Sequence, residues 1–181
     1  YIINKAEFYG LELYVDERVL IPRNDTEIMV DQAINIIDNN LSKIIYIDIW
    51  TWSSCIPIAI LKNINLDKVN MSYVIDISKK ALEVSYININ THKLNNIIIQ
   101  LEWSLLTPVI DKINKVDTIV ITANLPYIKD SDYDNMDNQT VEYEPDSALY
   151  WGPVTWFELY EELIQQCLYL KGFWNIKTIN L

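Results

Sequence analysis

Glycine is scarce in this sequence of 181 residues: it occurs three times, where average usage of about 7% would give roughly 13. Histidine occurs once, as His92, and cysteine twice, as Cys55 and Cys167. This set can build neither a zinc site nor a disulfide scaffold, so we expect no metal. A Ser-His or Cys-His catalytic pair would depend on His92, which lies in a polar stretch predicted as helix. We therefore expect no such pair.

Long apolar runs are also missing. No stretch approaches the roughly 18–20 uncharged apolar residues that a membrane helix needs, and no signal peptide is visible at the start of the chain. We therefore expect a cytoplasmic protein without a membrane partner. The formal net charge of −11 argues against nucleic acid as a partner, because nucleic-acid binders rely on basic patches. It suits a protein partner or a small cationic ligand better.

The chain does contain an alternation of β-branched runs and amphipathic segments. Strands are predicted over residues 43–49, 71–77, 96–101 and 117–123, and helices over 26–39, 55–63, 78–91 and 157–170. Residues 6–15 indicate a short hairpin or extended arm, and residues from 174 onward are predicted to begin a further strand. Asp25 is a plausible N-cap for the first helix, and Ser78 for the third. The rhythm predicts an α/β fold with a doubly wound, mostly parallel sheet.

The turn after the first predicted strand is where such a sheet binds its ligand. It reads Asp48-Ile49-Trp50-Thr51-Trp52-Ser53-Ser54-Cys55. A cofactor-binding turn favours glycine, because its backbone approaches the ligand and adopts positive φ. Two tryptophans obstruct close approach and disfavour positive φ, so we expect this turn as written to bind a nucleotide poorly.

Two other strands bring polar residues to the same edge. Asp76 ends the second strand, where it can accept hydrogen bonds from a ribose or share the capping of the next helix with Ser78. The fourth strand is followed by Asn124-Leu125-Pro126-Tyr127. An Asn side chain and an adjacent backbone carbonyl can accept both N–H bonds of an amino or amide group, and Tyr can pack on a planar substrate. The alternative is an ordinary proline-containing turn that leaves a strand.

Three segments together resemble the HemK-type glutamine methyltransferases, which modify peptide chain release factors. Residues 19–27 are similar to the family signature VLIPRPDTE, with Asn24 as the only departure. Residues 48–56 are similar to D-x-G-T-G-S-G-C-I. Residues 124–128 are similar to N-P-P-Y-I, and the Glu-Pro and Ala-Leu pairs at 144–145 and 148–149 follow as in the family. The resemblance covers nearly the whole chain.

The resemblance implies a Rossmann-like class I methyltransferase fold. It also implies a hairpin arm or linker over residues 1–24 and an S-adenosylmethionine-dependent methyltransferase domain over 25–181. By comparison with the family, we expect the given sequence to lack the N-terminal helical domain and the final strands. The methyl acceptor would be a glutamine side-chain nitrogen in a peptide chain release factor.

The resemblance also implies the site residues. Leu125 replaces the family's Pro and Ser104 its Asp. The Asn124 side-chain oxygen and the Leu125 carbonyl would hold the glutamine N–H bonds, Pro126 would stiffen the loop and Tyr127 would pack on the glutamine. The catalytic positions are thus Asn124, Leu125, Pro126 and Tyr127. The cofactor-binding positions are Asp48, Trp50, Thr51, Trp52, Ser53, Ser54, Asp76, Ser104, Leu105 and Asn124.

The six tryptophans share one property: each falls where the family carries, or readily accepts, glycine. They are Trp50, Trp52, Trp103, Trp151, Trp156 and Trp174. We hypothesise that the gene uses UGA for glycine and that the codon has been read here as Trp. The alternative is a true tryptophan protein, a degenerate methyltransferase fold kept as a non-catalytic binding module. A third reading is an adenine amino-methyltransferase on DNA or RNA, because those enzymes share an N/D-P-P-Y/F segment.

Overall fold

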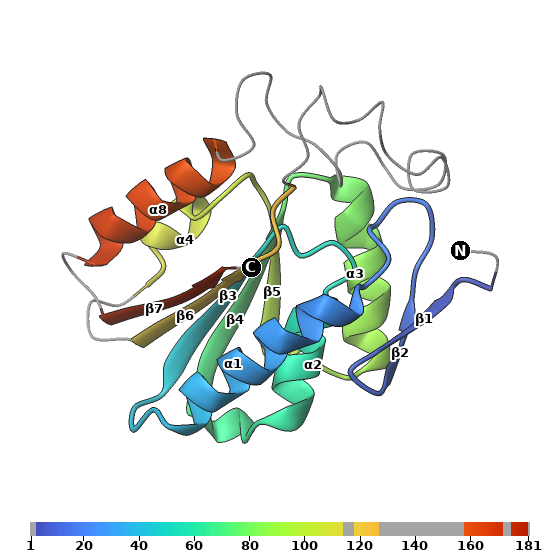
Figure 1. Ribbon diagram of the computed structural model, residues 1–181, viewed down its shortest axis with the longest axis horizontal. Helices are drawn as coiled ribbons and strands as arrows, with labels where there is room; N and C mark the ends of the chain where they lie inside the picture. Colours follow the sequence, from blue (N-terminus) through green and yellow to red (C-terminus); the bar gives the residue numbers. More distant parts are fainter. Residues whose placement is uncertain (1–2, 114–117, 127–157, 172–174, 181) are drawn as a thin grey trace.

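A computed structural model describes residues 3–113, 118–126, 158–171 and 175–180 (Figure 1). Its N-terminal part is an antiparallel hairpin of β1 (Lys5–Phe8) and β2 (Leu11–Tyr14). The hairpin turn places Tyr9 and Gly10 at φ values of 52° and 71°. Two successive left-handed residues match the right-handed twist of a short hairpin. The hairpin predicted from the alternation is confirmed.

The core of the molecule is a five-stranded sheet in the order β5-β4-β3-β6-β7, with every neighbouring pair parallel. Both β3 and β6 are buried along their whole length, as expected of strands covered on two faces. This is the predicted doubly wound, Rossmann-like sheet. The strands are β3 (Ile44–Ile49), β4 (Val69–Asp76), β5 (Ile98–Glu102), β6 (Thr118–Ala123) and β7 (Asn175–Asn180).

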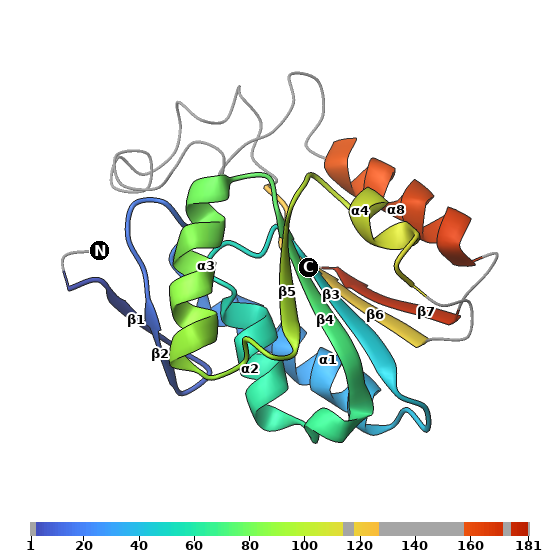
Figure 2. The same ribbon diagram turned by 180° about the vertical axis from the view of Figure 1, so that it is seen from behind.

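Helices cover both faces of the sheet (Figures 1 and 2). On one face, α1 (Glu27–Asp38) and α2 (Cys55–Asn63) share a core cluster with Ile44 and Tyr46 of β3. The alternate residues Ile45 and Ile47 point to the other face, which α8 (Glu158–Lys171) and the short α4 (Thr107–Ile110) cover. Because side chains of a strand alternate between faces, one sequence of β-branched residues serves both layers. The remaining helix, α3 (Lys79–Thr91), packs along β5 and β2.

Helix starts were predicted with mixed success. Ser78 caps α3 as expected, its hydroxyl accepting a hydrogen bond from the Ala81 N–H at 3.2 Å. Asp25 is not the N-cap of α1, and that prediction is wrong. A 3-10 turn spans Asn24–Thr26, and Thr26 becomes the cap residue without a side-chain capping bond. A 3-10 turn before a helix shifts its start beyond the residue that a capping pattern selects.

Besides this 3-10 turn, two short elements were not predicted. They are α4 and a 3-10 helix at Leu66–Lys68. Each is too short to show an apolar period. Among the described helices, none combines the length and the apolarity that crossing a membrane requires.

Candidate active site

The predicted site residues meet at one edge of the sheet, where the parallel strands end. The turn after β3 is tied to β4, because the Thr51 N–H donates to the Ile75 carbonyl at 3.1 Å. The Trp52 N–H donates to Asp76 Oδ2 at 2.9 Å. The indole Nε1 of Trp52 donates to the Asn124 carbonyl at 3.2 Å. The structure thus brings together the ends of three strands that the sequence pattern assigned to one site.

The backbone of the turn has an unusual conformation. Trp50, Trp52 and Ser54 have φ values of 58°, 49° and 63°. In this left-handed region a residue with a side chain is destabilised by roughly 1–2 kcal/mol, whereas glycine adopts it freely. These are the three positions at which the resembling motif carries glycine. The turn therefore has a glycine-type backbone built without glycine.

The two indoles fill the space above the strand ends. Trp50 is 1% exposed and Trp52 3% exposed, and their rings pack edge to face with centroids 5.6 Å apart. Leu105 and Leu125, two other predicted site residues, belong to the same core cluster. The S-adenosylmethionine implied by the resemblance fits the backbone of this turn but not these side chains.

Asp76 is completely buried and both of its carboxylate oxygens are used. Oδ2 accepts from the Trp52 N–H, and Oδ1 accepts from the Ser78 N–H at 2.8 Å. Burial raises the pKa of Asp76 to about 6, opposed by the backbone N–H groups of Ser78 and Trp52. The side chain therefore joins the start of α3 to the turn. A ribose would reach it only after neighbouring side chains move.

Asp48 ends a buried chain of hydroxyl groups. The Thr122 hydroxyl donates to Asp48 Oδ1 at 2.5 Å, which leaves the Tyr46 hydroxyl to donate to Thr122 Oγ1, also at 2.5 Å. Asp48 Oδ2 is buried without a hydrogen-bond partner among the described residues. Burial raises the pKa of Asp48 to about 7, because an ionised carboxylate without enough donors is costly in the interior. Thr122 was missed because it lies on a strand far along the sequence.

The segment after β6 is only partly described. Asn124 is half-buried, whereas Leu125 and Pro126 are buried. The Leu125 carbonyl accepts a hydrogen bond from the Tyr160 hydroxyl of α8 at 3.4 Å. Tyr160 was not predicted to belong to the site. Tyr127 lies outside the described residues.

The bend after β5 carries the remaining predicted cofactor residues. Ser104 is half-buried and Leu105 is 1% exposed. Trp103 precedes them, and its N–H donates to the Asp76 carbonyl at 3.0 Å. Its side chain is 51% exposed, and its φ is not positive, so its backbone has no need of glycine. The tryptophans at 151, 156 and 174 lie outside the described residues.

Two polar residues of α3 support the turn and were also missed. The Asn88 side chain donates to the Ser53 carbonyl at 3.0 Å, and Ser85 Oγ lies 2.5 Å from Ser54 Oγ. Both are buried and share a helix face with Ala81. Polar residues at i+4 and i+7 on an otherwise apolar stripe were the sequence signal that could have identified them. No group of three potential metal ligands occurs within the described ranges.

Several known proteins are similar in sequence to this chain. No family model matches the chain. A release factor glutamine methyltransferase from Rhodopirellula baltica is 35% identical over 156 residues, covering 84% of this chain and 50% of that protein. Another, from Lactococcus lactis, is 37% identical over 150 residues (83% and 51%). A third, from Mycoplasma mycoides, is 32% identical over 165 residues (91% and 55%). The chain therefore spans about half the length of these relatives.

Solved structures agree on the fold. The catalytic domain of hMettl16, in complex with a MAT2A 3'UTR hairpin, has a TM-score of 0.64 and 16% identity, covering 90% of this chain and 58% of that one. The N-terminal domain of human METTL16 with SAH has a TM-score of 0.59 and 14% identity (95% and 61%). At this identity the likeness concerns the fold alone, a class I methyltransferase sheet.

Proposed function

We propose that this chain, which belongs to the family of the release factor glutamine methyltransferases, methylates the side-chain nitrogen of a glutamine in a release factor. The methyl donor would be S-adenosylmethionine. One observation carries the proposal: the β3 turn, Asp76 and the Asn124 segment meet at a single sheet edge through two bonds of Trp52. Ligands of doubly wound sheets bind at this edge.

The acceptor side of the site would hold the glutamine amide. An amide nitrogen is a weak nucleophile, so positioning and hydrogen-bond acceptors supply most of the assistance. The Asn124 side-chain oxygen and the Leu125 carbonyl are the proposed acceptors. The Leu125 carbonyl already accepts from Tyr160, but a carbonyl oxygen has a second lone pair for a substrate N–H. Pro126 and Tyr127 complete the proposed segment.

The donor side would be formed by the turn, with Asp76, Ser104 and Leu105 beside it. Because the indoles of Trp50 and Trp52 do not fit the cofactor, the proposal concerns the turn with glycine at these two positions. The division into an arm over residues 1–24 and a cofactor domain over 25–181 is part of the same proposal. The acidic charge of −11 favours a protein substrate over nucleic acid.

The test is a methylation assay with isotopically labelled S-adenosylmethionine, a purified release factor and mass spectrometry of its peptides. Three proteins are compared: the chain as written, Trp50→Gly/Trp52→Gly, and that variant with Asn124→Ala. We expect no labelled glutamine with the chain as written and labelled glutamine with the double glycine variant, with transfer about a hundredfold slower after Asn124→Ala is added. Label found in added DNA or RNA, and none in glutamine, would establish the adenine-modifying alternative instead.

A second candidate is a non-catalytic binding module. The specific observation that favours it is the burial of Trp50 and Trp52, which closes the cofactor turn in the chain as written. In that case the chain binds its protein partner without S-adenosylmethionine. Calorimetry distinguishes the two, because a module gains no cofactor binding from the double glycine variant.

A further inference from the structure

The strained turn after β3 needs support from outside itself. Three residues in the left-handed region within five positions persist only when neighbouring groups hold them. Trp52 is held by Asp76, and Thr51 by the Ile75 carbonyl. The carbonyl of Ser53, between two left-handed residues, is held from α3 by Asn88.

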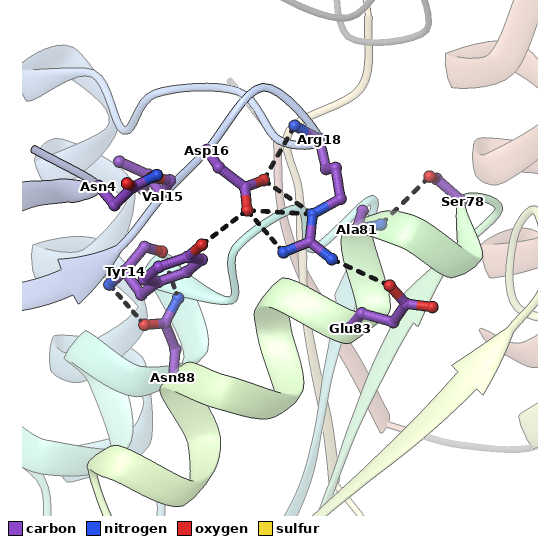
Figure 3. A network of polar contacts seen from close by, with 9 residues as sticks. All are labelled: Asn4, Tyr14, Val15, Asp16, Arg18, Ser78, Ala81, Glu83 and Asn88. Atoms are coloured by element: carbon purple, nitrogen blue, oxygen red, sulfur yellow. Dashed lines mark hydrogen bonds and ion pairs between the residues drawn. The ribbon is translucent and has the colours of Figure 1, made fainter. Parts of the chain in front are cut away.

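The side-chain amide of Asn88 forms hydrogen bonds with both the turn and the arm. Its Nδ2 donates to the Ser53 carbonyl at 3.0 Å and to the Tyr14 carbonyl at 2.9 Å. Its Oδ1 accepts from the Tyr14 N–H at 2.7 Å. Figure 3 shows the carboxamide lying against the backbone of Tyr14, which ends β2. At 1% exposure, Asn88 has no water to replace these three bonds.

The segment that follows Tyr14 is fastened to the same helix. The Arg18 guanidinium contacts both carboxylate oxygens of Asp16 and reaches Glu83 on α3 at 2.9 Å (Figure 3). Hydrogen bonds from Arg18 keep the pKa of Asp16 below its usual range, so the pair stays ionised. Glu83 precedes Asn88 by five residues on α3, so the arm is held to this helix at two separate points.

We propose that Asn88 is a positioning residue that couples the N-terminal arm to the cofactor turn. Its single carboxamide completes its bonds only when Tyr14 and Ser53 are both in place. Docking of the arm therefore favours the left-handed turn, and the turn favours docking by the same factor, because such coupling is reciprocal. Residues 19–27, the segment that most resembles the glutamine-modifying family, follow directly on Arg18. The proposal deepens the proposed function and relies on it only for the identity of the ligand.

Ser85 supports the turn without touching the arm, which makes it a useful contrast. Its hydroxyl lies 2.5 Å from Ser54 Oγ and accepts from Gln100 Nε2 of β5 at 2.8 Å. Removing this hydroxyl loosens the turn directly and affects the arm only indirectly, through Asn88. Removing the donor group of Asn88 loosens the turn and the arm together.

The experiment is hydrogen exchange with mass spectrometry on the full chain, which needs neither cofactor nor activity. Asn88→Asp keeps the size of the side chain but cannot donate to either carbonyl. Its matched control is Asn90→Asp, with the same charge change on the same helix at a half-buried residue whose side chain donates to the Tyr86 carbonyl and contacts neither the turn nor the arm. We expect exchange to rise roughly tenfold in peptides covering 11–18 and 51–56, and to stay unchanged in 118–123. Ser85→Ala should raise it mainly in 51–56, with a smaller rise in 11–18 that passes through Asn88.

Near-ultraviolet circular dichroism provides a second readout, because the Trp50–Trp52 pair packs edge to face and its signal depends on the turn. We expect Asn88→Asp to reduce that signal and Asn90→Asp to preserve it. Equal acceleration of all three peptides would make Asn88 a residue of general stability and overturn the coupling. Acceleration of the arm peptide with an unchanged turn would overturn it as well. A lack of S-adenosylmethionine binding by the glycine variants contradicts only the proposed function.

Discussion

The indole Nε1 of Trp52 lies 3.2 Å from the carbonyl oxygen of Asn124 and joins the turn after β3 to the segment after β6. In the family that the chain belongs to, these are the two segments between which we expect donor and acceptor to meet. Under the proposed function, the side chain of Trp52 would therefore have to leave this position before a ligand could connect them. The same residue has a φ of 49°, a value that glycine would adopt without strain.

The first prediction concerns Trp50→Gly/Trp52→Gly. Relief of left-handed strain stabilises by about 1–2 kcal/mol per residue, whereas removing a buried Trp side chain costs about 3–5 kcal/mol. The cavity therefore outweighs the strain, and we expect the ligand-free variant to be less stable than the chain as written. S-adenosylmethionine at a hundred times its Kd should return about 2.7 kcal/mol, measured as a rise in Tm.

Trp103→Gly is the control for this experiment. Trp103 is half exposed and its φ is not positive, so the same substitution there creates no buried cavity and relieves no strain. Its Tm should not respond to S-adenosylmethionine. Micromolar binding by the chain as written would contradict the claim that the indoles exclude the cofactor.

The second prediction concerns the gene. If the recoding hypothesis holds, the six tryptophan positions are encoded by UGA, and the protein from its native host is lighter by six Trp-to-Gly mass differences. The left-handed φ values of Trp50 and Trp52 support this at two positions. Nucleotide sequencing and intact-protein mass spectrometry check it directly. UGG codons at these positions would end the hypothesis and favour the binding module.

The fold could be predicted from the sequence because its signals are local. Runs of β-branched residues marked the strands, and Ser78 marked the start of α3. The doubly wound, mostly parallel sheet followed from the alternation of strands and helices. The contacts of Thr122 with Asp48, and of Asn88 with Ser53, join residues many positions apart. No local pattern encodes such pairs, so the edge of the site was predictable and its supporting bonds were not.

The third prediction concerns Leu125, where the family has proline. Proline fixes φ near −65°, which would hold the preceding chain and the carbonyl of residue 125 in one orientation. In the double glycine variant we expect Leu125→Pro to raise kcat by roughly two- to tenfold through orientation. Its stability should fall slightly, because the buried Leu125 side chain is lost. The kcat of glutamine methylation is the measurement, and an unchanged or lower value would contradict the assigned role of this carbonyl.

The last prediction concerns pH and the buried carboxyl of Asp48. Its pKa is about 7 in the folded chain against an ordinary value of 3.8, so the folded state binds the proton more tightly than the unfolded state. The corresponding stability is fully present below pH 3.8 and is lost as the pH rises through 7. Between pH 5.5 and 7.5 this group alone should lower the free energy of unfolding by about 2 kcal/mol, from the difference between the two pKa values. Asp76, with a pKa of about 6, acts in the same direction.

Asp48→Asn isolates this effect, because the amide is neutral at every pH and its oxygen can still accept from Thr122. Urea denaturation gives the free energy of unfolding of the chain and of Asp48→Asn. As the pH rises, we expect the value for the chain to fall relative to the value for Asp48→Asn. Asp67→Asn, at an exposed aspartate in the 3-10 helix before β4, controls for the loss of one negative charge and should leave the pH profile of the chain unchanged. A difference that does not vary between pH 5.5 and 7.5 would mean that Asp48 is ionised in the folded protein throughout. The Thr122 and Thr51 hydroxyls, which oppose the effect of burial on the pKa of Asp48, would then be the donors that stabilise its charge.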